Sequence, residues 1–175
     1  MKAGLAVLRV RRSAVCPTRG ILVAGRIAYP CVLGRSGIVA GKREGDGGTP
    51  RGRLPLRGVL QRPGRGPRLR TVLPSRLTRP FEAWCDDVAD RRYNRLVSRA
   101  PGEAEERLWR ADRLYDVVVP LGWNDGPLVR GRGSAIFWHV CRRERTPTAG
   151  CIAVEPEVFR KLLPRLARHA VMVIG

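Results

Sequence analysis

The apolar residues of this chain come in short runs broken by glycine and proline, and this pattern is the strongest constraint on its fold. Among its 175 residues are 20 glycines and 14 prolines. The runs lie at 5–10, 21–25, 26–34, 54–60, 114–121, 134–140 and 170–174. Short apolar runs bounded by turn-forming residues are typical of β-strands. We therefore expect a mainly β fold with one or two short helices, in a single domain over 1–175.

One helix is predicted near the C-terminus, over Glu155–Arg168. Its apolar side chains recur at helical spacing, at Val158, Phe159, Leu162, Leu163 and Leu166. Pro156 suits the first turn, and Pro164 is expected to kink or end the helix because it lacks an N–H. Elsewhere we expect a short helix over Glu103–Arg113, an ordered loop with a helical turn at 84–97, and turn-rich connections at 41–53 and 61–80.

Positive charge dominates the composition. Lysine and arginine number 34 against 15 acidic residues, which gives a net charge of +19. Such an excess suggests a polyanionic partner, such as nucleic acid or an anionic envelope polymer. However, the basic residues are spread along the chain singly or in short runs, and aromatic residues make up only 6%. We therefore favour general arginine usage and expect no specific nucleic acid partner.

Membrane insertion and export leave no clear signal in the sequence. No apolar stretch approaches the roughly 18 residues of a membrane span. The apolar residues 3–8 are followed at once by Arg9, Arg11 and Arg12, so this segment is too short for a signal peptide.

Five cysteines and two histidines limit the chemistry that is available. The number of cysteines is odd and no CxxC pair occurs, which argues against a zinc ribbon or a full disulfide framework. With only His139 and His169, a multi-histidine metal site is excluded, so we expect no metal. We assign a packing role to four of the cysteines: Cys16, Cys31, Cys85 and Cys141.

His139 and Cys151 form the most informative pair. His139 lies near the end of a strand-like run, and Cys151 follows Gly150 after a polar loop. A cysteine nucleophile needs a base or a cationic neighbour that raises its thiolate fraction. The loop adds positive charge through Arg142, Arg143 and Arg145. From spacing alone, a small buried cysteine and a structural histidine remain the alternative.

Residues 133–163 resemble the signature of the L,D-transpeptidase catalytic domain family. That signature is a histidine, a loop, and then Ser/Thr-x-Gly-Cys with a hydrophobic residue, which reads here as His139 and then Thr148-Ala149-Gly150-Cys151-Ile152. Upstream, GDGGTPRGRLPL (45–56) resembles the family's Gly…Thr-Pro-x-Gly strand motif, and WCDDVADRRYN (84–94) resembles a block of a compact bacterial subgroup. The likeness covers about residues 20–174. It implies a β-sandwich or open barrel.

The resemblance also implies roles for individual residues. Cys151 would be the nucleophile and His139 the general base, with the carbonyl of Val140 orienting the imidazole. The N–H groups of Gly150 and Cys151 would line the oxyanion hole, and Thr148 takes the family's hydroxyl position. Peptidoglycan stem peptides would be the substrate, a carbapenem would form a covalent adduct, no cofactor would be needed, and the site of action would be the periplasm or cell envelope.

Two positions depart from the family pattern. Ala149 stands where the family usually has histidine, and Ala153 stands where it often has arginine or asparagine. These changes concern the orientation of substrate. They leave open a different acyl acceptor, or hydrolysis as the main outcome.

Several further residues are predicted to contact a peptide substrate because they lie in or beside loops: Tyr93, Asn94, Trp123, Asn124 and Arg142. For Trp123 core packing is the alternative, and Asn124 also suits a plain turn. Three other functions stay open. They are an L,D-carboxypeptidase, another cysteine acyltransferase, and a non-catalytic basic module that binds nucleic acid or an anionic envelope polymer. A sortase is disfavoured because Arg160, Arg165 and Arg168 fall in the predicted helix.

Overall fold

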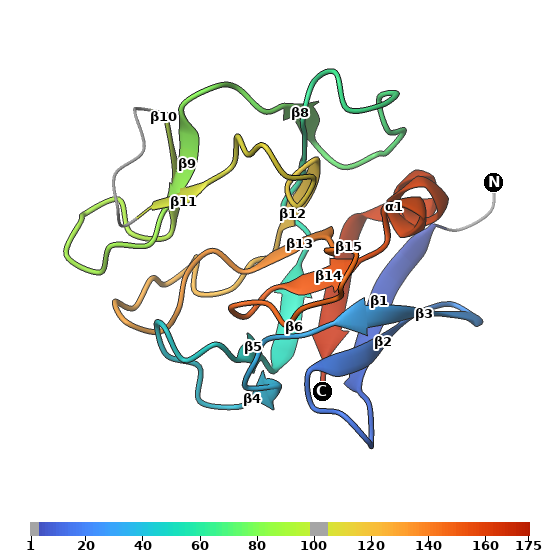
Figure 1. Cartoon of the computed structure of the whole chain (residues 1–175), viewed down its shortest axis with the longest axis horizontal. Helices are drawn as coiled ribbons and strands as arrows, with labels where there is room; N and C mark the ends of the chain where they lie inside the picture. Colours follow the sequence, from blue (N-terminus) through green and yellow to red (C-terminus); the bar gives the residue numbers. More distant parts are fainter. Residues whose placement is uncertain (1–3, 99–104) are drawn as a thin grey trace.

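A curled sheet of ten strands forms an open half-barrel in the computed structural model, which describes residues 4–98 and 105–175 (Figure 1). The strand order is β6-β15-β1-β2-β3-β14-β13-β12-β7-β8. These strands are β1 (Leu5–Arg12), β2 (Arg19–Ala24), β3 (Ile27–Val32), β6 (Gly52–Pro55), β7 (Val59–Gln61), β8 (Ser75–Leu77), β12 (Val117–Pro120), β13 (Phe137–Val140), β14 (Ile152–Val154) and β15 (Leu166–Ile174). The predicted mainly β fold is confirmed.

Two smaller sheets accompany the large one. Strands β4 (Ile38–Val39) and β5 (Thr49–Pro50) form a short parallel pair. Strands β9 (Glu82–Cys85), β10 (Arg95–Ser98) and β11 (Glu105–Arg107) form a three-stranded sheet in the order β10-β9-β11. Trp84 of this small sheet packs edge-on against Phe137 of β13, with ring centroids 5.2 Å apart. The small sheet therefore lies over the part of the large sheet that carries His139.

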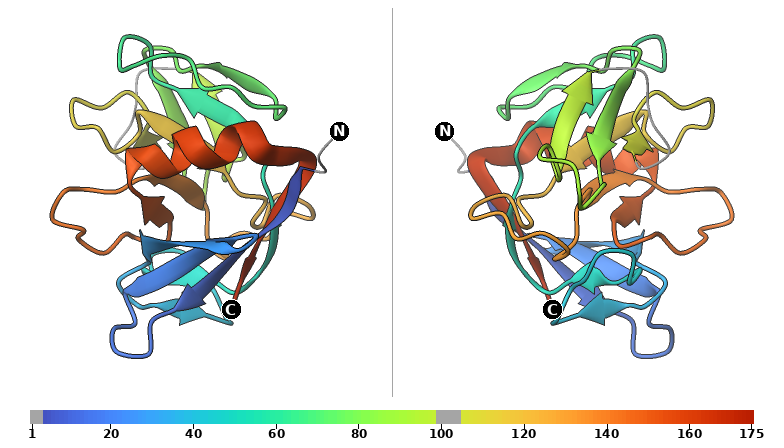
Figure 2. Two further views of the ribbon diagram at one scale, coloured as in Figure 1. Left: turned by 90° about the vertical axis from the view of Figure 1, so that its right-hand side faces the viewer. Right: turned by 90° about the vertical axis from the view of Figure 1, so that its left-hand side faces the viewer.

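Alternation of side chains defines the two faces of the large sheet. In β1, Leu8 and Val10 are buried, whereas Arg9 and Arg11 are exposed, as the two-residue period of a strand requires. The buried face packs against α1 (Pro156–Leu162), which crosses the concave side of the sheet (Figure 2). On this side Trp138 of β13 stacks on Phe159 of α1, with ring centroids 4.4 Å apart. The main core therefore lies inside the curl of the sheet.

The C-terminal helix is shorter than predicted. It begins at Pro156 and ends at Leu162, and a 3-10 turn over Leu163–Arg165 follows. The helix ends before Pro164 because that residue lacks an N–H and its ring would clash with the previous turn. Strand β15 then starts at Leu166, so Arg168 lies on a strand and not in the helix. It is exposed there, on a strand that pairs with β1 and β6.

Three other local predictions are wrong. The run 54–60 is divided between β6 and β7, because β6 pairs with β15 and β7 pairs with β12. Residues 84–97 contain the ends of β9 and β10 around a turn. In place of a helix over Glu103–Arg113, the described residues form β11 and then bends, and 103–104 lie outside the described residues. Strand β9 pairs with β10 on one side and with β11 on the other. This backbone pairing makes 95–98 and 105–107 strands.

Strands β13 and β14 run parallel and are joined by the loop 141–151. Trp138 lies opposite Ile152, and His139 lies opposite Ala153. Cys151 immediately precedes β14, so it is level with Phe137. This connection brings the two residues of the predicted catalytic pair onto neighbouring strands. Within residues 4–98 and 105–175, no helix is long and apolar enough to cross a membrane.

Candidate active site

His139 is a fully enclosed side chain on β13. It is 2% exposed, and its ring packs edge-on against Tyr115, with centroids 5.2 Å apart. Nδ1 lies 2.8 Å from the carbonyl oxygen of Val140, the group that the resemblance implies as the orienting partner. When Nδ1 carries the proton and donates it to this carbonyl, Nε2 is left as the proton acceptor.

The thiol of Cys151 is also enclosed, with 7% of the residue exposed. Sγ donates to the carbonyl oxygen of Ala135 at 3.2 Å and accepts from the N–H of Phe137 at 3.3 Å. Around it lies an apolar cluster that separates it from solvent. The cluster consists of Leu60, Leu108, Tyr115, Val118 and Phe137, with Trp84, Leu114 and Ala135 packed against it.

Cys151 and His139 lie on the same face of the large sheet. Cys151 is level with Phe137, which precedes His139 by two residues on that face. One strand spacing across and two residues along separate the Cα atoms of such neighbours by about 8 Å. The thiol hydrogen bond goes to Ala135 in this arrangement. Transfer of its proton to His139 therefore requires the thiol to leave that carbonyl.

Burial sets the charge state of both groups. It raises the pKa of the Cys151 thiol to about 12, against which the N–H of Phe137 has a smaller lowering effect. Burial also lowers the pKa of His139 to about 4, although hydrogen bonds to the backbone of Val140 and Leu114 act in the opposite direction. At neutral pH the pair is therefore a thiol and a neutral imidazole.

The expected effect of the loop arginines on the thiol is wrong. Arg142 lies 3.9 Å from Asp112, and Arg145 forms an ion pair with Glu155 at 3.0 Å. The cation that lowers the pKa of Cys151 is Lys42, from a different segment. All three arginines are exposed, and Arg142 and Arg145 are paired with carboxylates, so their charge is neutralised or screened before it reaches the thiol.

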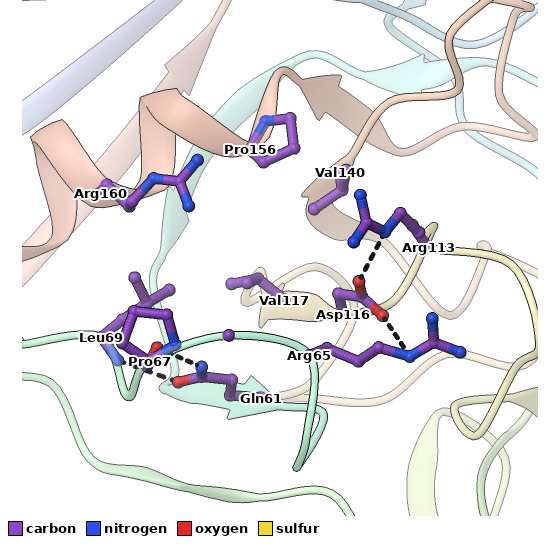
Figure 3. A pocket seen from close by; sticks show the side chains of 11 residues that line it. Gln61, Arg65, Pro67, Leu69, Arg113, Asp116, Val117, Val140, Pro156 and Arg160 are labelled. Atoms are coloured by element: carbon purple, nitrogen blue, oxygen red, sulfur yellow. Dashed lines mark hydrogen bonds and ion pairs between the residues drawn. The ribbon is translucent and has the colours of Figure 1, made fainter.

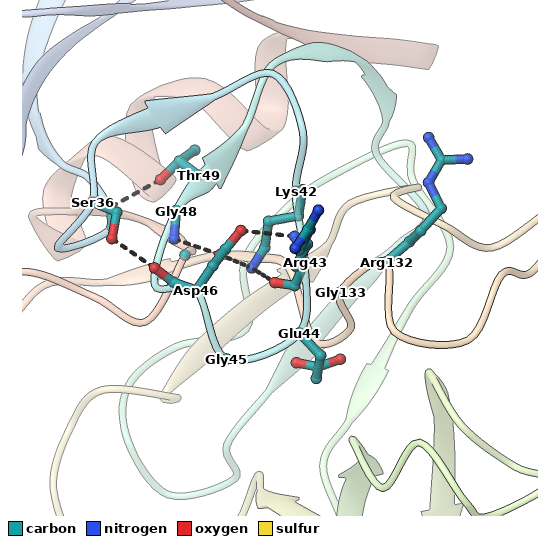
Figure 4. Close-up of polar contacts among 12 residues, drawn as sticks. Ser36, Lys42, Arg43, Glu44, Gly45, Asp46, Gly48, Thr49, Arg132 and Gly133 are labelled. Atoms are coloured by element: carbon teal, nitrogen blue, oxygen red, sulfur yellow. Dashed lines mark hydrogen bonds and ion pairs between the residues drawn. The ribbon is translucent and has the colours of Figure 1, made fainter.

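A lysine–aspartate pair shapes the loop beside Cys151 (Figure 4). The Lys42 side chain is 2% exposed and pairs with the carboxylate of Asp46. Asp46 also accepts from the N–H of Arg43 at 2.7 Å and from that of Gly48 at 2.8 Å. Burial opposes ionisation of Asp46, but these hydrogen bonds hold its pKa below the usual value. The motif GDGGTP is therefore a compact turn built around one carboxylate.

The backbone of Gly150 passes very close to this turn. Gly150 has φ +142°, and a Cβ atom there would lie 2.8 Å from the carbonyl oxygen of Gly48. Gly34 is equally crowded, since a Cβ atom would lie 2.2 Å from the carbonyl oxygen of Gly47 and 3.1 Å from Cα of Gly150. Only glycine fits such close backbone contacts. This contact explains why the upstream motif and the Gly-Cys pair occur together.

Replacing Gly150 with alanine should therefore distort the nucleophile's position. We expect Gly150→Ala to lower stability by about 1–3 kcal/mol, because a side chain is strained at this φ and must displace Gly48. Urea denaturation measures this loss. Gly41→Ala is the matched control, since a Cβ atom at Gly41 meets nothing within 4 Å. Equal stability of the two variants would contradict the close contact.

The residues next to Cys151 in the sequence differ in their burial and in their hydrogen bonds. The hydroxyl of Thr148 accepts from the N–H of Gly150 at 3.1 Å and donates to the carbonyl of Cys151 at 2.7 Å. It closes the turn, and Gly150 would have to release Thr148 before its N–H could serve an oxyanion. Ala149 is exposed, whereas Ala153 is buried opposite His139.

Asn94 connects the remaining predicted residues to Cys151. Its Oδ1 accepts from Trp84 Nε1 at 2.9 Å and from the N–H of Ala135 at 3.2 Å. Its Nδ2 donates to the carbonyls of Trp123 and Asn124 at 2.9 and 3.0 Å. Ala135 has φ +52°, and its carbonyl is the partner of the thiol. Asn94 thus braces a strained residue that contacts the nucleophile.

Three other residues predicted to touch substrate make internal contacts. Tyr93 is buried and its hydroxyl donates to Glu44. Asn124 Nδ2 donates to the carbonyl of Val129, and Trp123 Nε1 donates to that of Arg132. Their contact with a peptide stays a prediction.

Arg142 borders a hollow of about 340 Å³ beside His139. Its lining includes Leu114 and Val140, the two residues whose backbone bonds to the imidazole. Among the described residues, no group of three histidine, cysteine or acidic side chains is placed to hold a metal ion. Cys31 and Cys85 are buried free cysteines, in agreement with a packing role.

Sequence reasoning missed Lys42, Tyr115 and Ala135. Lys42 lies just before the recognised motif, and its position there was the available signal. Tyr115 and Ala135 carry no local signal, because their importance arises only when β13 and β14 come together.

The model of the YkuD family, described as L,D-transpeptidase catalytic domain, matches residues 19–174. No curated protein and no solved structure matches the chain.

Proposed function

The chain belongs to the L,D-transpeptidase catalytic domain family, and on that premise we propose that it is a cysteine-dependent transpeptidase of peptidoglycan stem peptides. The observation that carries the proposal is the parallel pairing of β13 with β14. It places His139, with Nδ1 against the carbonyl of Val140, on the same face as Cys151. A nucleophile, a base and a group that orients the base are the minimal parts of covalent acyl transfer.

The first half-reaction forms a thioester. The Cys151 sulfur attacks the carbonyl of the diamino acid in a stem tetrapeptide, while its proton passes to Nε2 of His139. A neutral thiol needs this base in the same step, because its own pKa is far above neutral. The tetrahedral intermediate collapses with cleavage of the C–N bond. The imidazolium returns the proton to the departing D-amino acid.

The second half-reaction resolves the thioester. An amine of a neighbouring stem attacks the thioester carbonyl and gives its proton to His139. The C–S bond breaks, the thiol regains its proton, and the product is a cross-link between two diamino acids. Water in place of the amine would make the protein an L,D-carboxypeptidase. Ala153, which lies opposite His139, is small and offers no polar group that could orient an acceptor amine. Hydrolysis therefore stays open as the alternative outcome.

Purified protein and a soluble stem tetrapeptide test the proposal. We expect release of the terminal D-amino acid together with a peptide dimer, both detected by liquid chromatography and mass spectrometry. Release without a dimer would favour the carboxypeptidase. A folded protein that releases nothing and gains no adduct from a carbapenem would overturn cysteine catalysis and favour a non-catalytic module.

A further inference from the structure

The acidic residues are distributed very unevenly along the chain, so its net positive charge is concentrated in the N-terminal half. Residues 1–81 contain 18 lysines and arginines against two acidic residues, Glu44 and Asp46, whereas 82–175 contain 16 against 13. The arginines are spread along the whole chain, but the carboxylates are not. Strands β1, β2, β3, β6 and β15 contain no acidic residue. These five are contiguous in the large sheet.

The strand register gathers three arginines on the convex face of these five strands. Arg53 of β6 lies opposite Val173 of β15, Val173 opposite Arg9 of β1, and Arg9 opposite Val23 of β2. Arg11 projects from the same face two residues further along β1, about 7 Å from Arg9. Between the arginines lies a floor of half-buried or exposed aliphatic side chains. We call Arg9, Arg11 and Arg53, with Val23, Val173 and Ile21, the arginine face.

In the described part of the chain, the cations of the arginine face form no ion pair, whereas several arginines elsewhere are held by carboxylates. In the hollow of about 150 Å³ in Figure 3, Asp116 lies 3.9 Å from Arg65 and 3.8 Å from Arg113. Similar pairs hold Arg57, Arg76, Arg110 and Arg160. Within the described ranges, Arg9, Arg11 and Arg53 form no ion pair. Their guanidinium groups are therefore available to an external anion.

The arginine face belongs to the same side of the sheet as the catalytic pair. Arg19 of β2 lies opposite Val32, Val32 opposite Ala153 of β14, and Ala153 opposite His139. Arg11 and His139 are separated by four strand spacings across the sheet and two residues along it, about 20 Å in all. The loop 141–150 lies between them, where the side chain of Arg19 donates to the carbonyl of Arg145. A long polymer can therefore reach both places at once.

The composition of the arginine face favours one class of polyanion over the others. It has no aromatic side chain, so it offers no stacking platform for single-stranded nucleic acid. Its aliphatic residues are two half-buried valines and one exposed isoleucine, whereas faces that insert into lipid carry protruding tryptophan, phenylalanine or leucine. Arginine binds carboxylates in a bidentate manner. Carboxylates that repeat along a polymer with aliphatic segments fit both the cations and the floor.

We propose that the arginine face binds the carboxylates of stem peptides further along the same peptidoglycan polymer whose reacting stem occupies the Cys151 site. This inference rests on the proposed function, and it assigns the face to substrate polymer rather than to the reacting peptide. Holding the polymer raises the effective concentration of stems at the site. It should matter for polymeric peptidoglycan and not for a soluble tetrapeptide.

Co-sedimentation with insoluble peptidoglycan, stripped of attached anionic polymers by acid, tests the proposal. The variant Arg9→Gln/Arg11→Gln/Arg53→Gln is compared with Arg70→Gln/Arg79→Gln/Arg91→Gln, which removes the same charge from exposed positions elsewhere. We expect the first variant to bind at least about tenfold more weakly and with a smaller dependence on salt. The second should bind within about twofold of the wild type. Acylation by a carbapenem should stay unchanged in both.

Three other outcomes contradict the proposal. Equal weakening of both variants would show that only net charge matters, and unaltered binding of both would show that the face is not used. Tighter binding of the wild type to duplex DNA, to a polyol-phosphate polymer or to anionic vesicles would assign the face to another partner. A wild type that binds peptidoglycan without carbapenem acylation would leave the face supported while refuting cysteine catalysis, so the two failures are distinguishable.

Discussion

Replacing Cys151 with alanine should abolish both covalent labelling and turnover. The wild type should gain the mass of one carbapenem, and Cys151→Ala should gain none. Release of D-amino acid from a tetrapeptide should fall by more than about 10⁴-fold, since removal of a covalent nucleophile costs this much or more. Alanine removes only the sulfur from a buried site, so the fold is expected to persist.

Cys16 supplies the matched control for that experiment. It is a free cysteine and partly exposed, and a hydrogen bond from Thr18 lowers the pKa of its thiol. Cys16 is therefore the best competitor for a thiol-directed reagent. Cys16→Ala should retain the full carbapenem adduct. An adduct that persists on Cys151→Ala and disappears on Cys16→Ala would refute the assignment of the nucleophile.

Replacement of His139 with glutamine should have the second largest effect. Glutamine cannot take up a proton at neutral pH, so acylation should slow by about 10²–10⁴-fold, the usual contribution of a general base. Intact-mass measurements at timed intervals give the acylation rate. The exposed His169 of β15 is the control, and His169→Gln should acylate at the wild-type rate.

The rate of acylation should depend on pH through the protonation of His139. The imidazole acts as base only while it is unprotonated, and burial holds the pKa of His139 at about 4. Acylation of the wild type should therefore be level above about pH 6 and fall as the pH drops through about 4. In His139→Gln this acid limb should disappear. A limb near pH 7 in the wild type would contradict the burial of the imidazole.

Alkylation of the thiol checks the same charge state independently. Because burial raises the pKa of Cys151 to about 12, iodoacetamide should modify it slowly at pH 7 and much faster as the pH approaches 11. Rapid alkylation at pH 6 would instead indicate a thiolate–imidazolium pair. The chemistry would then start from an ion pair rather than from a thiol and its base.

Much of the fold was predictable because its elements have local signals. The strands at 5–10 and 21–32 combine alternation with glycine turns, and Pro164 ended the helix for a local reason. The segment 82–107 was not predictable. Its three strands are short and charged, and they exist because β9 pairs with a neighbour on each side.

The candidate site shows the same division. His139, Cys151, Gly150 and the orienting carbonyl of Val140 followed from a motif whose spacing is local. The thiolate expected from nearby arginines did not follow, because those side chains turn toward Asp112 and Glu155. Charge at a site depends on which groups fold against it, and sequence neighbours on an exposed loop are poor guides to that.

The sequence by itself determined the β-rich class, the pairing of one histidine with one cysteine and the family to which they belong, because residue type and spacing encode these. Only the tertiary structure decided that the pair is neutral, since burial under Tyr115 and Trp84 comes from distant segments. The tertiary structure also decided which arginines lie together on one surface. Alternation sends Arg9 and Arg11 outward, and strand register places Arg53 beside them on the side of the sheet that carries His139.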